Sequence, residues 1–333
     1  MSVLSKPCHD APRAPAFAAP VADDLLEVER ILTETLQSKR PHVARLVAHL
    51  GHYRGKRLRP VLLLLTARAC GNVTPAHHVL GAVVEMIHTA TLVHDDVLDS
   101  ASMRRHVPTV NAQWDNQSSV LLGDYLFTHA FHLSATIGDA RACELIGEAT
   151  NAVCAGELQQ VAERGNLGIT EAEYFSIIDG KTAELTSCCC RLGALYAGMD
   201  ETTVESLARY GRSLGVAFQI ADDLLDLVGE ERTTGKSLGT DLDQKKLTLP
   251  LIRMFERAST ETAQRIRQIL HSPENHKREQ LAPFLTETGA IAYARHKAEE
   301  HAAAARAELD CLPPSECRAI LEHLAMQVVH RSH

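Results

Sequence analysis

Two copies of one acidic motif, each inside an otherwise apolar and helix-patterned stretch, constrain this chain more than any other feature. Both copies read Asp-Asp-x-x-Asp, and they span residues 95–99 and 222–226. Residues four apart share a face of a helix, so the first and last aspartates of each copy point the same way. Two such carboxylate faces repel each other unless cations lie between them, and Mg²⁺ is commonly held by a few carboxylates, waters and substrate phosphates. The pattern predicts a metal-bridged diphosphate site with the candidate ligands Asp95, Asp96, Asp99, Asp222, Asp223 and Asp226.

The composition indicates one all-α domain. Of the 333 residues, 45% are hydrophobic and only 4% are aromatic, and together with abundant Ala and Leu this bias favours helices over sheets. Neither a convincing period-two strand pattern nor an evident linker interrupts residues 22–333, so we expect a single domain there. Residues 1–21 are rich in Pro and Ala and are expected to form a disordered N-terminal arm.

Charge, hydropathy and cysteine usage argue against several classes of protein. The net charge of −8 argues against non-specific binding to nucleic acid. A transmembrane helix is not expected, because the chain lacks an apolar run of about 18 residues. The nine cysteines form no C-x-x-C pair and are interpreted as reduced core or surface residues. A cytoplasmic location is expected, since residues 1–21 lack the apolar core of a signal peptide.

Helical periodicity recurs along most of the chain, and both acidic motifs fall within it. We expect helices over residues 23–37, 62–70, 76–99, 118–135, 151–162, 171–193, 203–227, 247–256 and 290–309, with a last helix after Pro313-Pro314.

Basic residues accompany both acidic motifs. Arg104 and Arg105 follow the first motif, Lys236 and Lys246 follow the second, and residues 54–60 form a separate cluster, Arg-Gly-Lys-Arg-Leu-Arg-Pro. Arginine supplies a rigid fork for phosphate oxygens, and lysine supplies a compact charge suited to a leaving diphosphate. Each cluster alone is equally typical of solvated surface. Two separate cationic clusters beside two acidic faces imply two diphosphates.

An ordered series of segments resembles the all-trans polyprenyl diphosphate synthases of the isoprenoid synthase superfamily. The segments are R-G-K-R-L-R-P, I-H-T-A-T-L-V-H-D-D-V-L-D, R-R-x-x-P-T, L-L-G-D-Y-L, G-K-T-A, F-Q-I-A-D-D-L-L-D and G-K-S-L-G-T-D-L…K-L-T-L-P. The resemblance covers residues 22 to 330. It implies a helical bundle around a deep central cavity, a homodimer, and a prenyltransferase that uses about three Mg²⁺ ions.

The resemblance also implies residue roles. Both aspartate motifs match the Mg²⁺-binding motifs of the family. The positions that bind isopentenyl diphosphate match Lys56, Arg59, His88 and Arg105. The positions that contact the allylic diphosphate match Arg104, Lys181, Thr182, Gln219, Lys236 and Lys246. Two usual glycines are replaced, by Arg54 and His106, without loss of a charged group.

Product length in such a synthase depends on the cavity wall that leads into Asp95. Ala90 and Thr91, five and four residues before Asp95, are small where short-chain members of the family carry a bulky aromatic. Each helix turn of about 5.4 Å admits roughly one more isoprene unit, so we expect a long product of about seven to ten units, with octaprenyl favoured. Ala90→Tyr is expected to shorten it. Candidates for a deeper floor, which are equally well explained as core residues, are Val84, Met86, Ile87, Phe127 and Phe131.

Other interpretations of the same residues stay open. A shorter-chain farnesyl or geranylgeranyl diphosphate synthase would share every motif. A class I terpene cyclase would share the first aspartate motif and the fold, but it usually carries a different second metal motif. A non-catalytic synthase subunit would usually have eroded aspartate motifs, whereas all six aspartates are present here. The favoured long-chain product is expected to be passed to membrane enzymes as a quinone side chain.

Overall fold

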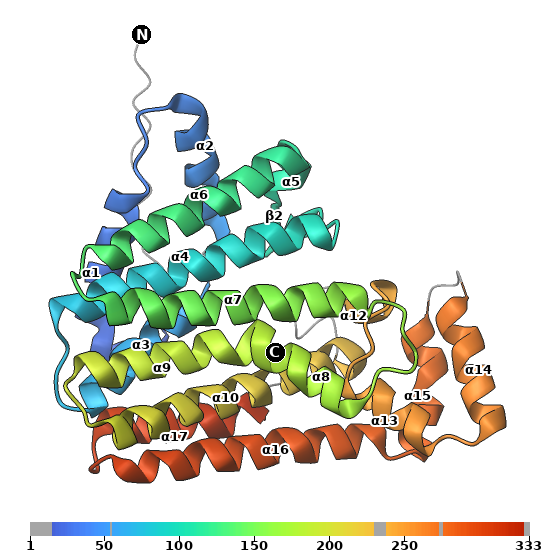
Figure 1. The fold of residues 1–333 in the computed structure, drawn as a ribbon. Helices are drawn as coiled ribbons and strands as arrows, with labels where there is room; N and C mark the ends of the chain where they lie inside the picture. Colours follow the sequence, from blue (N-terminus) through green and yellow to red (C-terminus); the bar gives the residue numbers. More distant parts are fainter. Residues whose placement is uncertain (1–14, 54, 230–237, 273–275, 330–333) are drawn as a thin grey trace.

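Helices make up nearly all of the described chain, which confirms the all-α prediction (Figure 1). The computed structural model describes residues 15–53, 55–229, 238–272 and 276–329. Its first half contains η1 (Ala16–Val21), α1 (Ala22–Thr35), α2 (Pro41–Leu50), η2 (Gly51–Tyr53), α3 (Leu58–Ala69), α4 (Pro75–Leu98), β1 (Met103–Arg104), β2 (Val107–Pro108), α5 (Val110–Gln113), α6 (Asn116–Ala135) and α7 (Ala140–Ala162).

The second half continues the bundle. It contains α8 (Glu171–Ile178), the π-helical turn η3 (Asp179–Ala183), α9 (Glu184–Tyr196), α10 (Glu201–Val228), α12 (Thr240–Asp243), α13 (Leu249–Arg257), α14 (Thr260–His271), α15 (Lys277–Glu287), α16 (Ala290–Glu308), η4 (Leu309–Cys311) and α17 (Glu316–Val329). In Figure 1 the long helices α4, α6, α7, α9, α10 and α16 run roughly side by side across the view. None of the helices in the described ranges is both long and apolar enough to serve as a membrane span.

The predicted segments are helical in the structure, but the predictions miss some helices and some helix ends. The helices α2, α14 and α15 were not predicted, and α7 begins eleven positions before the expected residue 151, at Ala140. The single helix expected over residues 171–193 is wrong, because the π-helical turn η3 separates α8 from α9. The expectation of no strands needs a small correction, since β1 and β2 form a two-residue antiparallel hairpin.

The disordered arm expected through residue 21 is too long. Residues 16–21 form η1, in which Ala18 and Val21 are fully buried. They join the core cluster that contains the apolar face of α3. Burial of these small side chains stabilises the segment despite its Pro and Ala composition. Residues 1–14 of the predicted arm lie outside the described residues.

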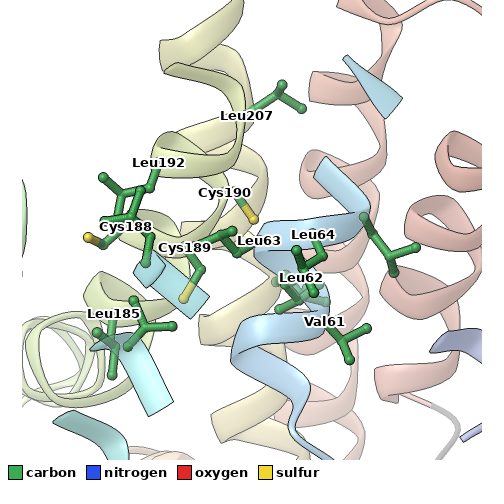
Figure 2. Packing of buried hydrophobic residues seen from close by; sticks show 14 of the residues in the cluster. Val61, Leu62, Leu63, Leu64, Leu185, Cys188, Cys189, Cys190, Leu192 and Leu207 are labelled. Carbon is green, nitrogen blue, oxygen red and sulfur yellow. The ribbon is translucent and has the colours of Figure 1, made fainter. Parts of the chain in front are cut away.

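The core forms around the apolar middle of α3, residues 61–65. Val61 to Leu65 are all fully buried, as expected for a helix enclosed by others. Figure 2 shows Leu63 on the side of α3 that faces Cys189 and Cys190 of α9. The three consecutive cysteines 188–190 are unpaired and buried, so they act as small apolar residues, as predicted.

Local sequence signals define the starts of the two helices that carry the aspartate motifs. Helix α4 begins with Pro75 at its first turn, and Thr74 and His77 form a capping box. The His77 ring also contacts the Gly193 carbonyl oxygen at 3.0 Å, which ties this start to α9. Helix α10 is capped by Asp200, whose side chain accepts from the Thr203 amide. Each aspartate motif lies towards the carboxyl-terminal end of its long helix.

Candidate active site

The first aspartate motif has two kinds of partner. Asp96 is fully buried, and its Oδ1 accepts a hydrogen bond from Arg104 Nε at 2.8 Å. Asp99 instead pairs with Arg164 Nη2 at 2.7 Å and with Lys246 Nζ at 3.3 Å. Asp99 thus lies beside two cationic side chains, whereas Asp96 is paired with Arg104.

Asp95 lies close to Lys181, which η3 carries. Burial raises the pKa of Asp95 to about 6, an increase that Lys181 opposes. The Lys181 ammonium pairs with Glu157 Oε1 of α7 at 2.7 Å. Burial works against this charge, but Asp95 and Glu157 outweigh it and raise the pKa of Lys181. Lys181 is therefore a retained cation beside the first motif.

The π-helical turn explains how Lys181 reaches this position. Gly156 of α7 and Gly180 permit close packing, because a Cβ atom at Gly156 would lie 2.6 Å from the Lys181 backbone nitrogen. Such turns recur at functional sites, where they re-aim side chains out of helical register. The next residue, Thr182, donates from its hydroxyl to Gln219 Oε1 at 2.7 Å. Two predicted allylic-site residues are thereby joined.

The second aspartate motif divides in a similar way. Asp223 is buried, where its Oδ2 accepts from the Tyr174 hydroxyl at 2.6 Å and its Oδ1 from Gln219 Nε2 at 2.8 Å. Burial raises the pKa of Asp223 well above its usual range. Asp226 accepts from the Asp241 backbone amide at 3.1 Å. The middle aspartate of each motif thus accepts hydrogen bonds from protein side chains: Arg104 for Asp96, and Tyr174 and Gln219 for Asp223.

A further acidic side chain belongs to the site and was not predicted. Burial, and after it the charge of Asp226, raise the pKa of Asp241 to about 7, while Lys246 opposes the rise. The sequence signal for this residue is its position in G-T-D-L, just after Gly239. Three other contributors were also missed: Glu157 and Tyr174, which look like ordinary helix residues in the sequence, and Arg164, which lies in the turn after α7.

The donor set fits Mg²⁺ that is shared with a substrate. Within the described ranges, no three Asp, Glu, His or Cys side chains approach closely enough to hold a metal ion by themselves. Both aspartate motifs lie towards the negative, carboxyl-terminal ends of α4 and α10. Burial raises the pKa values of Asp95 and Asp241, although Lys181 and Lys246 oppose the rise. A bound cation would offset the cost of these buried carboxylates, and Mg²⁺ usually combines one or two carboxylates with waters and phosphates. The residues placed to hold it are Asp95, Asp99, Asp222 and Asp226.

The residues predicted to bind isopentenyl diphosphate meet in one cavity. It has a volume of about 500 Å³ and lies between the second aspartate motif and the start of α3. All four predicted residues line it, together with all three aspartates of the second motif: Lys56, Arg59, His88, Arg105, Asp222, Asp223 and Asp226. The structure therefore joins one cationic cluster with one acidic face.

His88 is neutral in this cationic wall. It borders the cavity but lies deep in the protein, so burial holds its pKa well below the usual range, and the charges of Arg59 and Arg105 add to the effect. Burial also lowers the pKa of Arg59, whose Nε has no hydrogen-bond partner. A buried guanidinium donor without a partner costs free energy, so Arg59 is suited to receive an anionic ligand.

Arg105 is presented by the two-residue turn of the β1–β2 hairpin. The turn residues Arg105 and His106 have φ values of 50° and 64°. These left-handed values match a type I′ turn, which favours glycine because a side chain is strained there. His106, which occupies the position of a usual family glycine, therefore carries strain beside a cavity-lining arginine.

Replacing His106 by Gly is expected to stabilise the protein by about 0.5–1 kcal/mol, because glycine adopts the left-handed turn without the steric penalty. The measurement is the urea midpoint of unfolding. Met103→Gly, in the adjacent strand β1, serves as the control and should destabilise. A lower midpoint for His106→Gly would show that the imidazole makes a stabilising contact and would contradict the strain interpretation.

A second cavity, of about 380 Å³, adjoins the first and is mainly apolar. Both cavities are lined by Lys56, Leu58, Arg59 and Phe218, and the second extends to α17 at Leu324. A third and smaller cavity of about 70 Å³ lies beside Lys181 and Lys246.

The residues predicted to set product length border none of these three cavities. Ala90 is fully buried in a cluster with Leu46, Leu50 and Leu126, so Ala90→Tyr would overpack this cluster in addition to any effect on the product. Thr91 is half-buried. Of the other candidates, Val84, Met86 and Ile87 are buried in the main core, Phe127 packs partly buried against it, and Phe131 is 38% exposed.

The remaining allylic-site predictions divide between described and undescribed residues. Arg104 pairs with Asp96, and Lys246 pairs with Asp99, so both lie at the first motif. Lys236 lies outside the described residues, as does Arg54, the other replacement of a usual family glycine.

Comparisons with known proteins agree with this geometry. The family model described as polyprenyl synthetase matches residues 40–287. The octaprenyl diphosphate synthase of Escherichia coli is 37% identical over 315 residues, which is 93% of this chain and 96% of that protein. A crystal structure of a decaprenyl diphosphate synthase from Rhodobacter capsulatus has a TM-score of 0.89 and 38% identity, covering 95% of this chain and 98% of the other.

A third comparison concerns a ligand complex. The crystal structure of a polyprenyl synthase from Caulobacter crescentus, described as complexed with calcium and isoprenyl diphosphate, has a TM-score of 0.89 and 34% identity. It covers 95% of this chain and 97% of the other. The predicted resemblance and the predicted helical fold are confirmed, and the chain belongs to the polyprenyl synthetase family of prenyltransferases.

Proposed function

We propose that this enzyme condenses isopentenyl diphosphate successively onto an allylic diphosphate, with Mg²⁺, to give a long all-trans polyprenyl diphosphate. One observation carries the proposal: four cationic or imidazole side chains predicted for isopentenyl diphosphate line one cavity with the second aspartate motif. The allylic diphosphate would lie between the two motifs, where Lys181 and Lys246 provide the nearest positive charge. A calcium and isoprenyl diphosphate complex of the Caulobacter crescentus relative supports a metal and diphosphate site.

The chemistry follows from where the charges lie. Lys181 and Arg104 would stabilise negative charge on the departing allylic diphosphate, and bound Mg²⁺ would supply further neutralising charge. Lys56, Arg59 and Arg105 would hold the diphosphate of the isopentenyl substrate. Its double bond would then attack the allylic carbocation, and loss of a proton would give the trans product. The departed diphosphate is our candidate for the base, because His88 lies among arginines that disfavour its protonation.

The direct test is an assay of the purified chain with Mg²⁺, isopentenyl diphosphate and farnesyl or geranylgeranyl diphosphate, reading product length by mass. We expect a ladder that ends in a long-chain product. Turnover of an allylic diphosphate alone would indicate a terpene cyclase instead. No turnover by the single chain, with activity on adding a partner chain, would indicate a synthase subunit.

We propose an octaprenyl product, supported by the named octaprenyl and decaprenyl relatives and by the small residues before Asp95. A shorter product is the alternative. A chain of this length serves as the side chain of quinones, so we propose delivery to membrane enzymes from a cytoplasmic synthase.

Thr91→Tyr tests the predicted product-length wall, whose residues border none of the three cavities, at a position less tightly packed than Ala90. Thr91 is half-buried and lies four residues before Asp95, on the same helix face. A phenol there would obstruct the growing chain, so the expected product is shortened to roughly fifteen to twenty carbons, since each helix turn accommodates about one isoprene unit. Mass analysis of the product measures the effect, and Thr202→Tyr, at an exposed site on α10, is the control. An unchanged chain length would refute the assignment of this wall.

We propose that the chain acts as a homodimer. Helices α6 and α7 expose large apolar side chains, among them Leu121 (61% exposed) and Leu158 (72% exposed). Scattered single apolar residues are normal, but a group on helices in contact with each other is typical of an interface. Light scattering is expected to give twice the chain mass of 36.4 kDa, and a monomer mass at micromolar concentration would contradict the proposal.

A further inference from the structure

Arg57 lines the isopentenyl diphosphate pocket together with Lys56 and Arg59, but its guanidinium pairs with two glutamates. Its Nε pairs with Glu29 Oε1 of α1 at 2.5 Å, and its Nη1 pairs with Glu85 Oε1 of α4 at 2.6 Å. The side chain of Arg57 is 17% exposed and that of Glu85 is 7% exposed. Ion pairs this deep need good geometry to offset desolvation, and removing one partner leaves an unpaired buried charge.

Arg57 has a strained, left-handed backbone conformation next to two residues that line the cavity. Arg57 precedes α3 with φ 51° and ψ 39°, in the left-handed region, and no side-chain hydrogen bond caps the helix. A non-glycine residue keeps such a conformation only where surrounding contacts determine it. Its two ion pairs are contacts of that kind. Lys56 and Arg59, within two residues of Arg57, both line the cavity.

Glu85 also balances the charge of the pocket. Its Oε2 is buried without a hydrogen-bond partner, and its charge opposes the lowering of the Arg59 pKa. Glu29 and Glu85 thus pair with Arg57. Lys56, Arg59 and Arg105 supply the positive charge that is left for a ligand in the cavity.

We propose that Arg57 is a positioning residue for isopentenyl diphosphate: its bridge to Glu29 and Glu85 locks the left-handed turn that presents Lys56 and Arg59. The inference rests on the proposed function, since it concerns how that function's second substrate is held. It assigns no contact between Arg57 and the substrate.

The chain offers a matched control at the other end of the same helix. Arg68 of α3 pairs with Asp24 of α1 at 2.5 Å. It lies eleven residues beyond Arg57, about 16 Å along the helix. Arg68→Gln therefore removes a bridge between the same two helices without touching the turn.

The experiment compares Arg57→Lys, Arg57→Gly, Glu29→Gln and Arg68→Gln in steady-state kinetics with farnesyl diphosphate. We expect Arg57→Gly and Glu29→Gln to raise the KM for isopentenyl diphosphate about tenfold, because misplacement of a binding group is costly. Arg57→Lys should raise it less, since it keeps the charge. The KM for farnesyl diphosphate should stay within about twofold throughout, and Arg68→Gln should leave both KM values unchanged.

Each contrary result has a distinct meaning. If both Arg57 variants raise the KM and Glu29→Gln does not, Arg57 binds the substrate directly and the positioning role is wrong. If Arg57→Gly has the same KM values as the unaltered protein, a left-handed φ at residue 57 is sufficient for the turn, and the ion pairs to Glu29 and Glu85 are dispensable. If the unaltered protein itself does not use isopentenyl diphosphate, the proposed function has failed, and weaker binding of inorganic diphosphate by Arg57→Gly, measured by calorimetry, still tests the bridge.

Discussion

Asp95→Asn is expected to lower kcat by about 10³-fold while the protein remains folded, because it removes a carboxylate that would hold the Mg²⁺ needed to neutralise the leaving diphosphate. Asp95 is the first aspartate of its motif and lies beside Lys181, whereas Asp96 is occupied with Arg104. Asparagine keeps the shape of the side chain and removes only its charge. The measurement is single-turnover condensation at saturating Mg²⁺, and near-normal turnover would refute the role of the first motif.

The stability of the same variant gives an independent check. Because burial raises the folded-state pKa of Asp95 from its usual 3.8 to about 6, the folded protein loses stability as the pH rises between these values. The neutral amide escapes this loss. In the presence of a chelator, we expect Asp95→Asn to increase the free energy of unfolding at pH 8 by on the order of 3 kcal/mol, and to change it little at pH 4.

The control for this measurement is Asp310→Asn, at a side chain that is 81% exposed. It should change stability little at either pH. If Asp95→Asn were destabilising at pH 8, the nearby cations would outweigh the cost of burying the carboxylate, and the conclusion that burial raises the pKa of Asp95 would be wrong.

Lys181→Gln is expected to lower kcat by about 10² to 10³-fold, since one preorganised cation at the departing diphosphate is lost. The KM for isopentenyl diphosphate should stay nearly constant, because the residues predicted to bind that substrate line a cavity that Lys181 does not border. Rapid-quench measurement of the first condensation separates this effect from product release.

Two further variants make the Lys181 result specific. Lys181→Arg keeps the positive charge and should recover part of the rate. Lys297→Gln removes a partly buried lysine of α16 that pairs with Glu300, and it should leave kcat unchanged. A large rise in the KM for isopentenyl diphosphate with unchanged kcat would place Lys181 at the wrong substrate.

Much of the fold and of the site could be predicted from the sequence, because strong local patterns carried them. The helical periodicity around the aspartate motifs located α4 and α10. The cluster at residues 54–60 and the pair Arg104-Arg105 supplied cationic residues that the structure gathers at the two motifs. These features are local in sequence, and their chemistry follows from residue type alone.

The rest depended on tertiary contacts that local patterns do not encode. The π-helical turn at Lys181 exists because two glycines let α7 approach, and neither glycine marks a helix break by itself. The pairing of Asp96 with Arg104 and of Asp223 with Tyr174 distinguishes aspartates that look equivalent in the motif. The role of Arg164 required knowledge of which loop covers Asp99.

The π-helical turn has a consequence for how this enzyme can change over evolutionary time. A π-helical turn holds one residue more than the α-helical turn that it replaces, and each residue of an α-helix is rotated by about 100° from the next. Loss of a single codon between Asp179 and Ala183 could therefore straighten the chain into one uninterrupted helix. The residues on one side of the deletion would then rotate away from the leaving group. We therefore expect that deletion of one residue in this turn would give a protein that keeps the helical bundle but loses catalytic activity.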